Sequence, residues 1–335
     1  MKLDLPPLGW HTFFSTWQLR PVWDLVALVL VVGYLLALQR GRRSSGTAVV
    51  HPARVASYVA GMVVLAVTLS SSIDVYAHAL FWVHMIGHLL LIMVVPALVV
   101  CGHPLTVVRE AVRRHGRSST GETRSWFDRV LASRGVRVLT HPVVGLLQYG
   151  AVLVLTHLTD FMDQMMRHPW LSNGEHVLYL VSGYVFFLPL LGSEPIPTRL
   201  PRLMRIFLLV VGMVPDTIVG IVLLQAAHPL YPLMAAMAPS WGPGAVQDIN
   251  IGGALMWAVG DGLMMFFAVG LVIALIADPD RDAAFGPWLE NVRRQNLRDQ
   301  VGDGGTLLTD DTDLDNDEEA LRAYNEMLGR LGGPR

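Results

Sequence analysis

The sequence predicts an all-α integral membrane protein: a seven-helix transmembrane bundle with its N-terminus outside the cell and its C-terminus inside. Composition indicates the class, because hydrophobic residues make up 53% of the chain and charged residues only 16%, whereas soluble domains carry about 25% charged residues. The number of spans follows from the apolar stretches, and the orientation follows from the distribution of arginine.

A helix needs about 20 mostly apolar residues to cross a bilayer core of about 30 Å. Seven stretches approach or exceed this length, although the second and fourth are short. They are Val22–Leu38, Val55–Ser71, Ala79–Val100, Pro142–His157, Glu175–Leu191, Ile206–Leu224 and Ile251–Ala277. We therefore expect seven spans.

Basic residues are distributed unevenly between the connecting segments. The connectors after the first, third and fifth stretches hold fifteen arginines, whereas the N-terminus and the remaining connectors hold Lys2, Arg20 and Arg167. Lysine and arginine accumulate in cytoplasmic loops of membrane proteins. The odd-numbered connectors are therefore expected to be cytosolic, which places the N-terminus outside and the C-terminus inside.

Three parts are expected along the chain. Residues 1–21 form an extracytoplasmic interfacial segment, residues 22–277 the seven-span membrane domain, and residues 278–335 a cytosolic tail with the acidic run DDTDLDNDEE and a short amphipathic helix. Cys101 is the single cysteine, which excludes an internal disulfide and any paired-cysteine metal site. Membrane lipid is an expected partner, and nucleic acid is not.

The third stretch carries two histidines, which are costly to bury in hydrocarbon without a partner. His84 and His88 are four residues apart and so share one helical face. With the third span entering from outside, they lie about 8 Å and about 15 Å below the outer surface. Two imidazoles in this spacing can hold one metal ion, as in H-E-x-x-H sites.

Other polar side chains converge on the same outer half of the membrane. His157 ends the fourth stretch, and His176 opens the fifth. We predict a metal site formed by His84, His88, His157 and His176, although a single histidine at the end of a span is also an ordinary interfacial side chain. The auxiliary candidates are Asp248 at the outer lip, Asp216 and Asp261 near the midplane, and Met85, Met162, Met165 and Met166.

Two of these auxiliary groups have a second interpretation. Carboxylates inside a membrane are candidate functional groups, but Asp216 and Asp261 also suit hydrogen bonds between helices. The segment from Asp160 to His168, which holds three of the methionines, is expected to be an external loop. Imidazole with thioether suits copper, and imidazole with carboxylate suits zinc. Copper is the expected metal, with zinc as the alternative.

The stretch FWVHMIGHLLLIMVVPALVVCGHPL (residues 81–105) resembles the H-M-x-x-H-L-L-L…P…G-x-P-L signature of the multi-spanning CtaG-type cytochrome c oxidase assembly proteins. Further similarities are THPVVG before the fourth span, THL at its end, EH at the start of the fifth and GGALMW in the seventh. Two positions depart from the pattern: the usual D-Q pair reads Asp248–Ile249, and the P-P-L step reads Pro96–Ala97.

The resemblance implies a non-enzymatic, copper-handling assembly factor for haem-copper oxidase. It implies a bacterial plasma membrane location, and oxidase subunits or other assembly factors as partners. The matching positions are His84, His88, His157, His176 and Asp248.

Two other functions fit some of the residues. The first is a zinc-dependent membrane hydrolase, with His84, His88 and a third histidine on zinc and Asp216 or Asp261 acting on bound water. The second is a haem protein with two histidine ligands on different helices. Histidines lie only in the outer half of the spans, so at most one haem is expected.

The arginine distribution makes the topology testable. A reporter fused after Arg335 is expected to be cytosolic, and a reporter inserted near Met165 is expected to be extracytoplasmic. Reporter activity on each side of the membrane measures this. An extracytoplasmic C-terminus would reverse the assignment of sides.

Overall fold

The computed structural model describes residues 5–45, 48–113, 126–198 and 200–277, together with Leu321, Arg322 and Asn325. Contacts divide the chain into residues 1–271 and residues 272–335. The following description concerns the first unit. Apart from three helical residues, the expected cytosolic tail with its acidic run lies outside the described residues.

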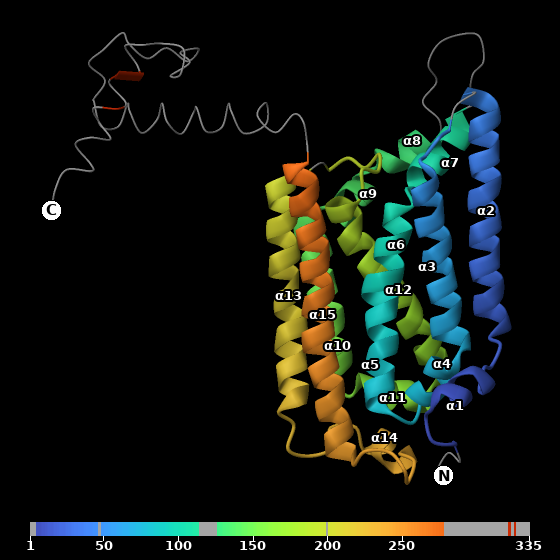
Figure 1. Cartoon of the computed structure of the whole chain (residues 1–335), viewed down its shortest axis with the longest axis vertical. Coiled ribbons are helices and arrows are strands. Elements are labelled where there is room, and N and C mark those ends of the chain that lie inside the picture. Colours follow the sequence, from blue (N-terminus) through green and yellow to red (C-terminus); the bar gives the residue numbers. More distant parts are fainter. Residues whose placement is uncertain are drawn as a thin grey trace. The chain divides into compact units, whose positions relative to one another are not determined.

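Every regular element in the described ranges is a helix, and these ranges contain no strand, as the composition predicted (Figure 1). The elements are α1 (Trp10–Ser15), α2 (Pro21–Ser45), α3 (Pro52–Ser70), α4 (Ser72–Ala77), α5 (Phe81–Leu89), the π-helix η1 (Leu90–Val94), α6 (Val95–Cys101), α7 (Pro104–Arg113), α8 (Trp126–Leu131), α9 (Arg134–Leu139), α10 (Pro142–His157), α11 (Phe161–Arg167), α12 (Pro169–Leu191), α13 (Arg202–Leu224), α14 (Pro232–Met237) and α15 (Ala245–Ile276).

Each of the seven expected spans falls on a helix. Among the described residues, six helices are long and apolar enough to cross a membrane: α2, α3, the continuous series α5–η1–α6, α12, α13 and α15. The fourth stretch is α10, which reaches the length only together with α11, and these two helices are bent by 69°. The membrane class is therefore confirmed, whereas a seventh span and the orientation of the termini stay predictions.

Three helix boundaries differ from those that the sequence predicted. The segment expected to be an external loop after His157 contains helix α11, because Met162 and Met165, three residues apart, are both buried against the bundle. Helix α12 begins at Pro169, whose fixed φ suits the first helical position, so Glu175 is not in its first turn. Helix α15 begins at Ala245 and contains Asp248 in its first turn.

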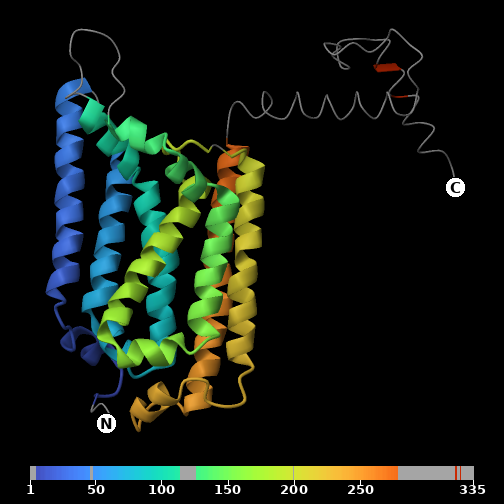
Figure 2. The same ribbon diagram turned by 180° about the vertical axis from the view of Figure 1, so that it is seen from behind.

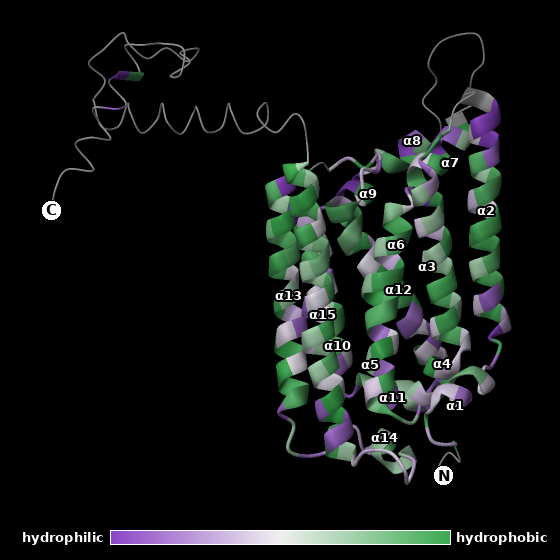
Figure 3. Cartoon of the chain, in the orientation of Figure 1, coloured by the Kyte–Doolittle hydropathy of each residue, from purple (hydrophilic) through white to green (hydrophobic). Residues whose placement is uncertain are grey.

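The short helices separate into two groups at opposite ends of the bundle. Helices α7, α8 and α9 lie at one end, and α1, α4, α11 and α14 lie at the other (Figure 1). Apolar residues dominate the long helices between these ends (Figure 3). Many of them are exposed, including Leu25 and Val29 on α2 and Phe266 on α15, as expected for side chains that face lipid.

Two buried carboxylates cap helices that are distant in sequence. Asp248 accepts hydrogen bonds from the backbone N–H groups of Phe81 and Trp82, at 2.8 and 3.0 Å, at the start of α5. Glu194 accepts from the N–H groups of Leu105 and Thr106, at 3.1 and 2.8 Å, at the start of α7. Helix N-termini have N–H groups without intrahelical partners, so each carboxylate joins two parts of the bundle. Burial raises the pKa of Glu194, and these N–H groups oppose the rise.

Helix α12 packs closely against the third span. It crosses η1 and α6 at an angle (Figure 2). Pro96 has no N–H, so the carbonyl of Ile92 lacks its α-helical donor. Gly183 of α12 packs directly on that carbonyl, and a Cβ at Gly183 would also lie 2.8 Å from Pro96 Cγ. The absence of a side chain at Gly183 therefore sets how near α12 approaches the third span.

Substitution of Gly183 tests this contact. Gly183→Ala is expected to destabilise the protein by about 1–3 kcal/mol, because the new methyl group has no space. Gly174→Ala, in the same helix, is the matched control: no atom lies within 4 Å of its Cβ position, so alanine should leave stability unchanged or raise it by up to about 1 kcal/mol. Thermal unfolding in detergent measures both. Equal melting temperatures would contradict the contact.

Candidate metal centre

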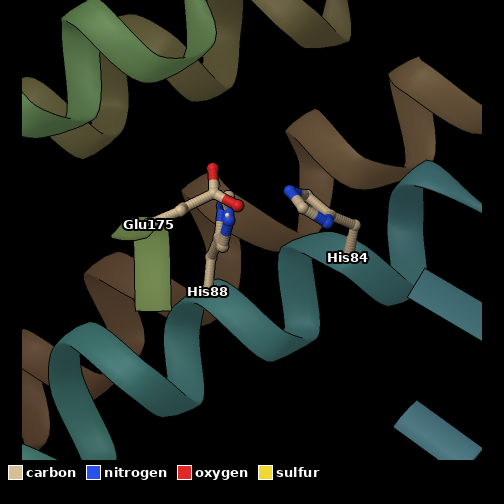
Figure 4. A group of neighbouring side chains, drawn as sticks. All are labelled: His84, His88 and Glu175. Atoms are coloured by element: carbon tan, nitrogen blue, oxygen red, sulfur yellow. Dashed lines mark ion pairs between the residues drawn. The ribbon is translucent and has the colours of Figure 1, made fainter. Parts of the chain in front are cut away.

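The candidate site lies where α5 and α12 face each other. His84 and His88 project from one face of α5, and Glu175 approaches them from α12 (Figure 4). One donor atom from each of these side chains lies within 4.8 Å of the others. All three residues are buried, with 8%, 6% and 2% of their surface exposed. We call His84, His88 and Glu175 the triad.

His157, at the end of α10, determines which nitrogen of His88 carries hydrogen. The Nδ1 of His157 lies 2.8 Å from the carbonyl of Leu153, and because a carbonyl only accepts, Nδ1 must donate. In a neutral imidazole the Nε2 of His157 is then an acceptor, and it lies 3.2 Å from Nδ1 of His88. We assign the donated hydrogen of this pair to His88 Nδ1.

This assignment directs a lone pair of His88 into the triad. The Nε2 of His88 lies 3.4 Å from Glu175 Oε1 and makes no hydrogen bond. Two acceptor atoms that face each other repel unless a proton or a metal ion lies between them. Metal-binding histidines commonly donate their second ring N–H to a fixed acceptor, and His157 supplies that acceptor.

The unpartnered atoms of the triad fit a bound cation. His84 Nε2, His88 Nε2 and Glu175 Oε2 are buried without a hydrogen-bond partner. An unsatisfied buried polar atom costs about 1–3 kcal/mol, and more when it is charged. A metal ion held by two imidazoles and a carboxylate would satisfy these three groups together. No other described side chain does so.

Two tyrosines and a threonine contact the histidines of the site or lie next to them. The Tyr179 ring is stacked on His88 with centroids 4.1 Å apart, and its hydroxyl lies 2.6 Å from Thr156 Oγ1. Tyr231 donates to the carbonyl of His157 at 2.6 Å. The stacking on Tyr179 restrains the ring of His88, and the hydrogen bond from Tyr231 fixes the backbone of His157, so both contribute to a preorganised site.

The structure brings together three of the four predicted ligands. His84, His88 and His157 meet in the buried site, whereas His176 is separate from the triad and lines a neighbouring cavity with Met165 and Met166. Glu175 was not among the predicted ligands. The sequence signal that could have identified it is a carboxylate in a largely apolar helix, one residue before the predicted ligand His176. Metal binding itself stays a prediction.

The auxiliary candidates lie in different parts of the bundle, and two of them line a cavity beside the triad. Met85 and Asp216 line the same cavity as His88 and His157, of about 10 Å³. Asp216 accepts from Tyr149 at 2.9 Å. Asp261 of α15 accepts a hydrogen bond from Thr217 of α13 at 2.7 Å. This bond between helices agrees with the second interpretation of Asp261. Met162 belongs to the core.

The chain is similar to known bacterial proteins over nearly its whole length. The profile of the family described as cytochrome c oxidase caa3 assembly factor (Caa3_CtaG) matches residues 32–278. An uncharacterized protein of Mycobacterium leprae is 28% identical over 96% of this chain and 46% of its own length. One from Mycobacterium bovis is 26% identical over 96% and 45%. This chain therefore spans about half the length of these curated relatives. No solved structure matches.

The different places of His88 and His157 predict graded losses of metal affinity. His88→Ala removes a donor atom and should abolish tight binding at the triad. His157→Phe removes no donor atom of the triad but removes the acceptor that orients His88, so affinity should fall by about 10–100-fold. His141→Ala, at the other end of α10, is the control and should have no effect. Titration of Cu(I) against a competing chelator measures all three. Equal losses for His88→Ala and His157→Phe would instead make His157 a direct ligand.

Proposed function

This chain belongs to the cytochrome c oxidase caa3 assembly factor family, and we propose that it binds copper at the triad and passes it to an oxidase subunit or another assembly factor. In this proposal the protein acts in the bacterial plasma membrane and is not an enzyme. The triad would lie in the outer half of the membrane, so copper would arrive from outside the cell.

One observation carries the proposal: the three donors of the triad are buried, mutually close and otherwise unpartnered. Three protein donors are fewer than the four that close a structural tetrahedral site. A position is therefore left for a ligand from the receiving protein. An assembly factor needs this property, because it must release its metal.

Thioethers near the triad favour copper over zinc. Met165 and Met166 line the larger neighbouring cavity. Met85 lies near His88 but is not one of the three donors of the triad. Soft sulfur donors suit Cu(I), whereas the usual ligands of zinc in proteins are Cys, His, Asp and Glu. Methionine also fills gaps in helical cores, and the methionines that favour copper are those that line a cavity.

The zinc hydrolase is a second candidate because two histidines and one glutamate are the ligands of several catalytic zinc sites. In H-E-x-x-H enzymes the glutamate after the first histidine is the general base. Here that position is Met85, which cannot accept a proton. Asp216 already accepts from Tyr149, and Asp261 accepts from Thr217. The triad therefore offers zinc ligands without an evident base.

The haem alternative has no comparable support. His88 and His157 are in direct contact, at 3.2 Å between ring nitrogens. The cavity that they line measures about 10 Å³, about the volume that one water needs. A porphyrin between these two histidines would require the helices to separate.

Histidine substitutions test the copper proposal in cells. His84→Ala and His88→Ala should each sharply lower the copper bound per purified protein and leave the host's cytochrome oxidase short of copper, with the protein still present in the membrane. His51→Ala and His141→Ala, which cap helices α3 and α10, should do neither. Elemental analysis and oxidase activity are the measurements.

The outcome separates the candidates. If both pairs of variants behave alike, the triad is not the copper site. If the wild type retains zinc and no copper under copper-replete conditions, the copper proposal fails and the hydrolase becomes the better candidate.

A further inference from the structure

A second cavity adjoins the triad at the same end of the bundle. Its volume is about 130 Å³, which is room for several waters. Arg20 and segments of α2, α3, α4, α11 and α12 enclose it, so it lies among the short helices α4 and α11. Glu175 belongs to the triad, and His176, the next residue of α12, lines this cavity. The two sites are thus neighbours on one helical turn.

Soft donor groups gather in this cavity. Met165 and Met166 contribute thioethers from α11, and His78 and His176 contribute imidazoles. The Nδ1 of His176 is buried without a partner. The Nδ1 of His78 donates to the carbonyl of Asp74 at 2.8 Å, so in the neutral ring its Nε2 is a free acceptor.

The charged groups of the cavity are already paired with each other. Asp74 forms an ion pair with Arg20, with Nη2 and Oδ2 2.5 Å apart. Its carboxylate is therefore already paired. Besides the thioethers and imidazoles, the lining includes Ser172 and Asn173, which carry no charge, and Asn173 Oδ1 already accepts a hydrogen bond from Trp23. Hard cations such as Ca²⁺ and Mg²⁺ need oxygen ligands. Neutral sulfur and nitrogen donors suit Cu(I).

We propose that this cavity is an uptake site for Cu(I), in which Met165, Met166, His78 and His176 bind the ion before it reaches the triad. The inference rests on the proposed function and names where the metal arrives. From the uptake site the ion moves along α12 from His176 to Glu175. It exchanges thioether for carboxylate and imidazole donors, with no change of oxidation state.

The first test counts Cu(I) and identifies its ligands. The full-length protein in detergent is titrated with Cu(I) under anaerobic conditions, and X-ray absorption detects sulfur ligands. The wild type should bind two ions per chain, one with sulfur ligands. The double variant Met165→Leu/Met166→Leu should bind one ion, without sulfur. Met162→Leu is the matched control: Met162 is buried in the same helix but does not line the cavity, so two ions should remain.

Two further variants separate this inference from the proposed function. His84→Ala/His88→Ala should lose the ion without sulfur ligands and keep the other. His176→Leu, which leaves the methionines in place, should lower the affinity for the sulfur-bound ion at least 10-fold. The affinity for Zn²⁺ should not change in the double variant Met165→Leu/Met166→Leu.

The results that would overturn the uptake site are distinct. Absence of sulfur ligands in the wild type, or two ions with sulfur retained in the double methionine variant, would refute it and leave the triad proposal intact. Loss of the sulfur-bound ion in that variant, with no effect of His84→Ala/His88→Ala, would support the uptake site and refute the triad.

Discussion

The close contact between α12 and the third span is the constraint on which the candidate site depends. Gly183 packs on the Ile92 carbonyl, which Pro96 leaves without its helical donor. The π-helix η1 follows directly after α5, and such irregular turns occur frequently at functional sites. Because this contact sets the distance between α12 and α5, it also sets the distance between Glu175 and His88.

Polar groups within a membrane bundle need partners inside the protein, and most of the buried ones here have them. Asn250 donates to three carbonyls at the end of α13, and Asp248 caps α5. Against this background the unpartnered atoms are informative, and several of them belong to the triad and to His176. We interpret these atoms as donors for a metal ion, because those of the triad are also close to one another.

The two sites suit successive steps of metal handling. The larger cavity offers neutral sulfur and nitrogen donors, whereas the triad adds a carboxylate within a tightly packed, nearly dry site. In this proposal an ion passes from a site that selects for soft metals to one with an open position for a ligand from the receiving protein. The chain covers about half the length of its mycobacterial relatives. The protein that would receive the metal therefore belongs to the proposal.

The sequence by itself determined the helical membrane class, the positions of the apolar stretches and the pairing of His84 with His88. These follow from local rules: hydrocarbon requires long apolar helices, and residues four apart share a helical face. Tertiary structure alone decided that Glu175 completes the triad, that His157 orients His88, and that His176 faces the methionines of α11. Contacts between helices depend on crossing angles and close approaches such as that at Gly183, which no spacing along one helix encodes. The same is true of Asp248, whose partners at the start of α5 lie more than 160 residues away.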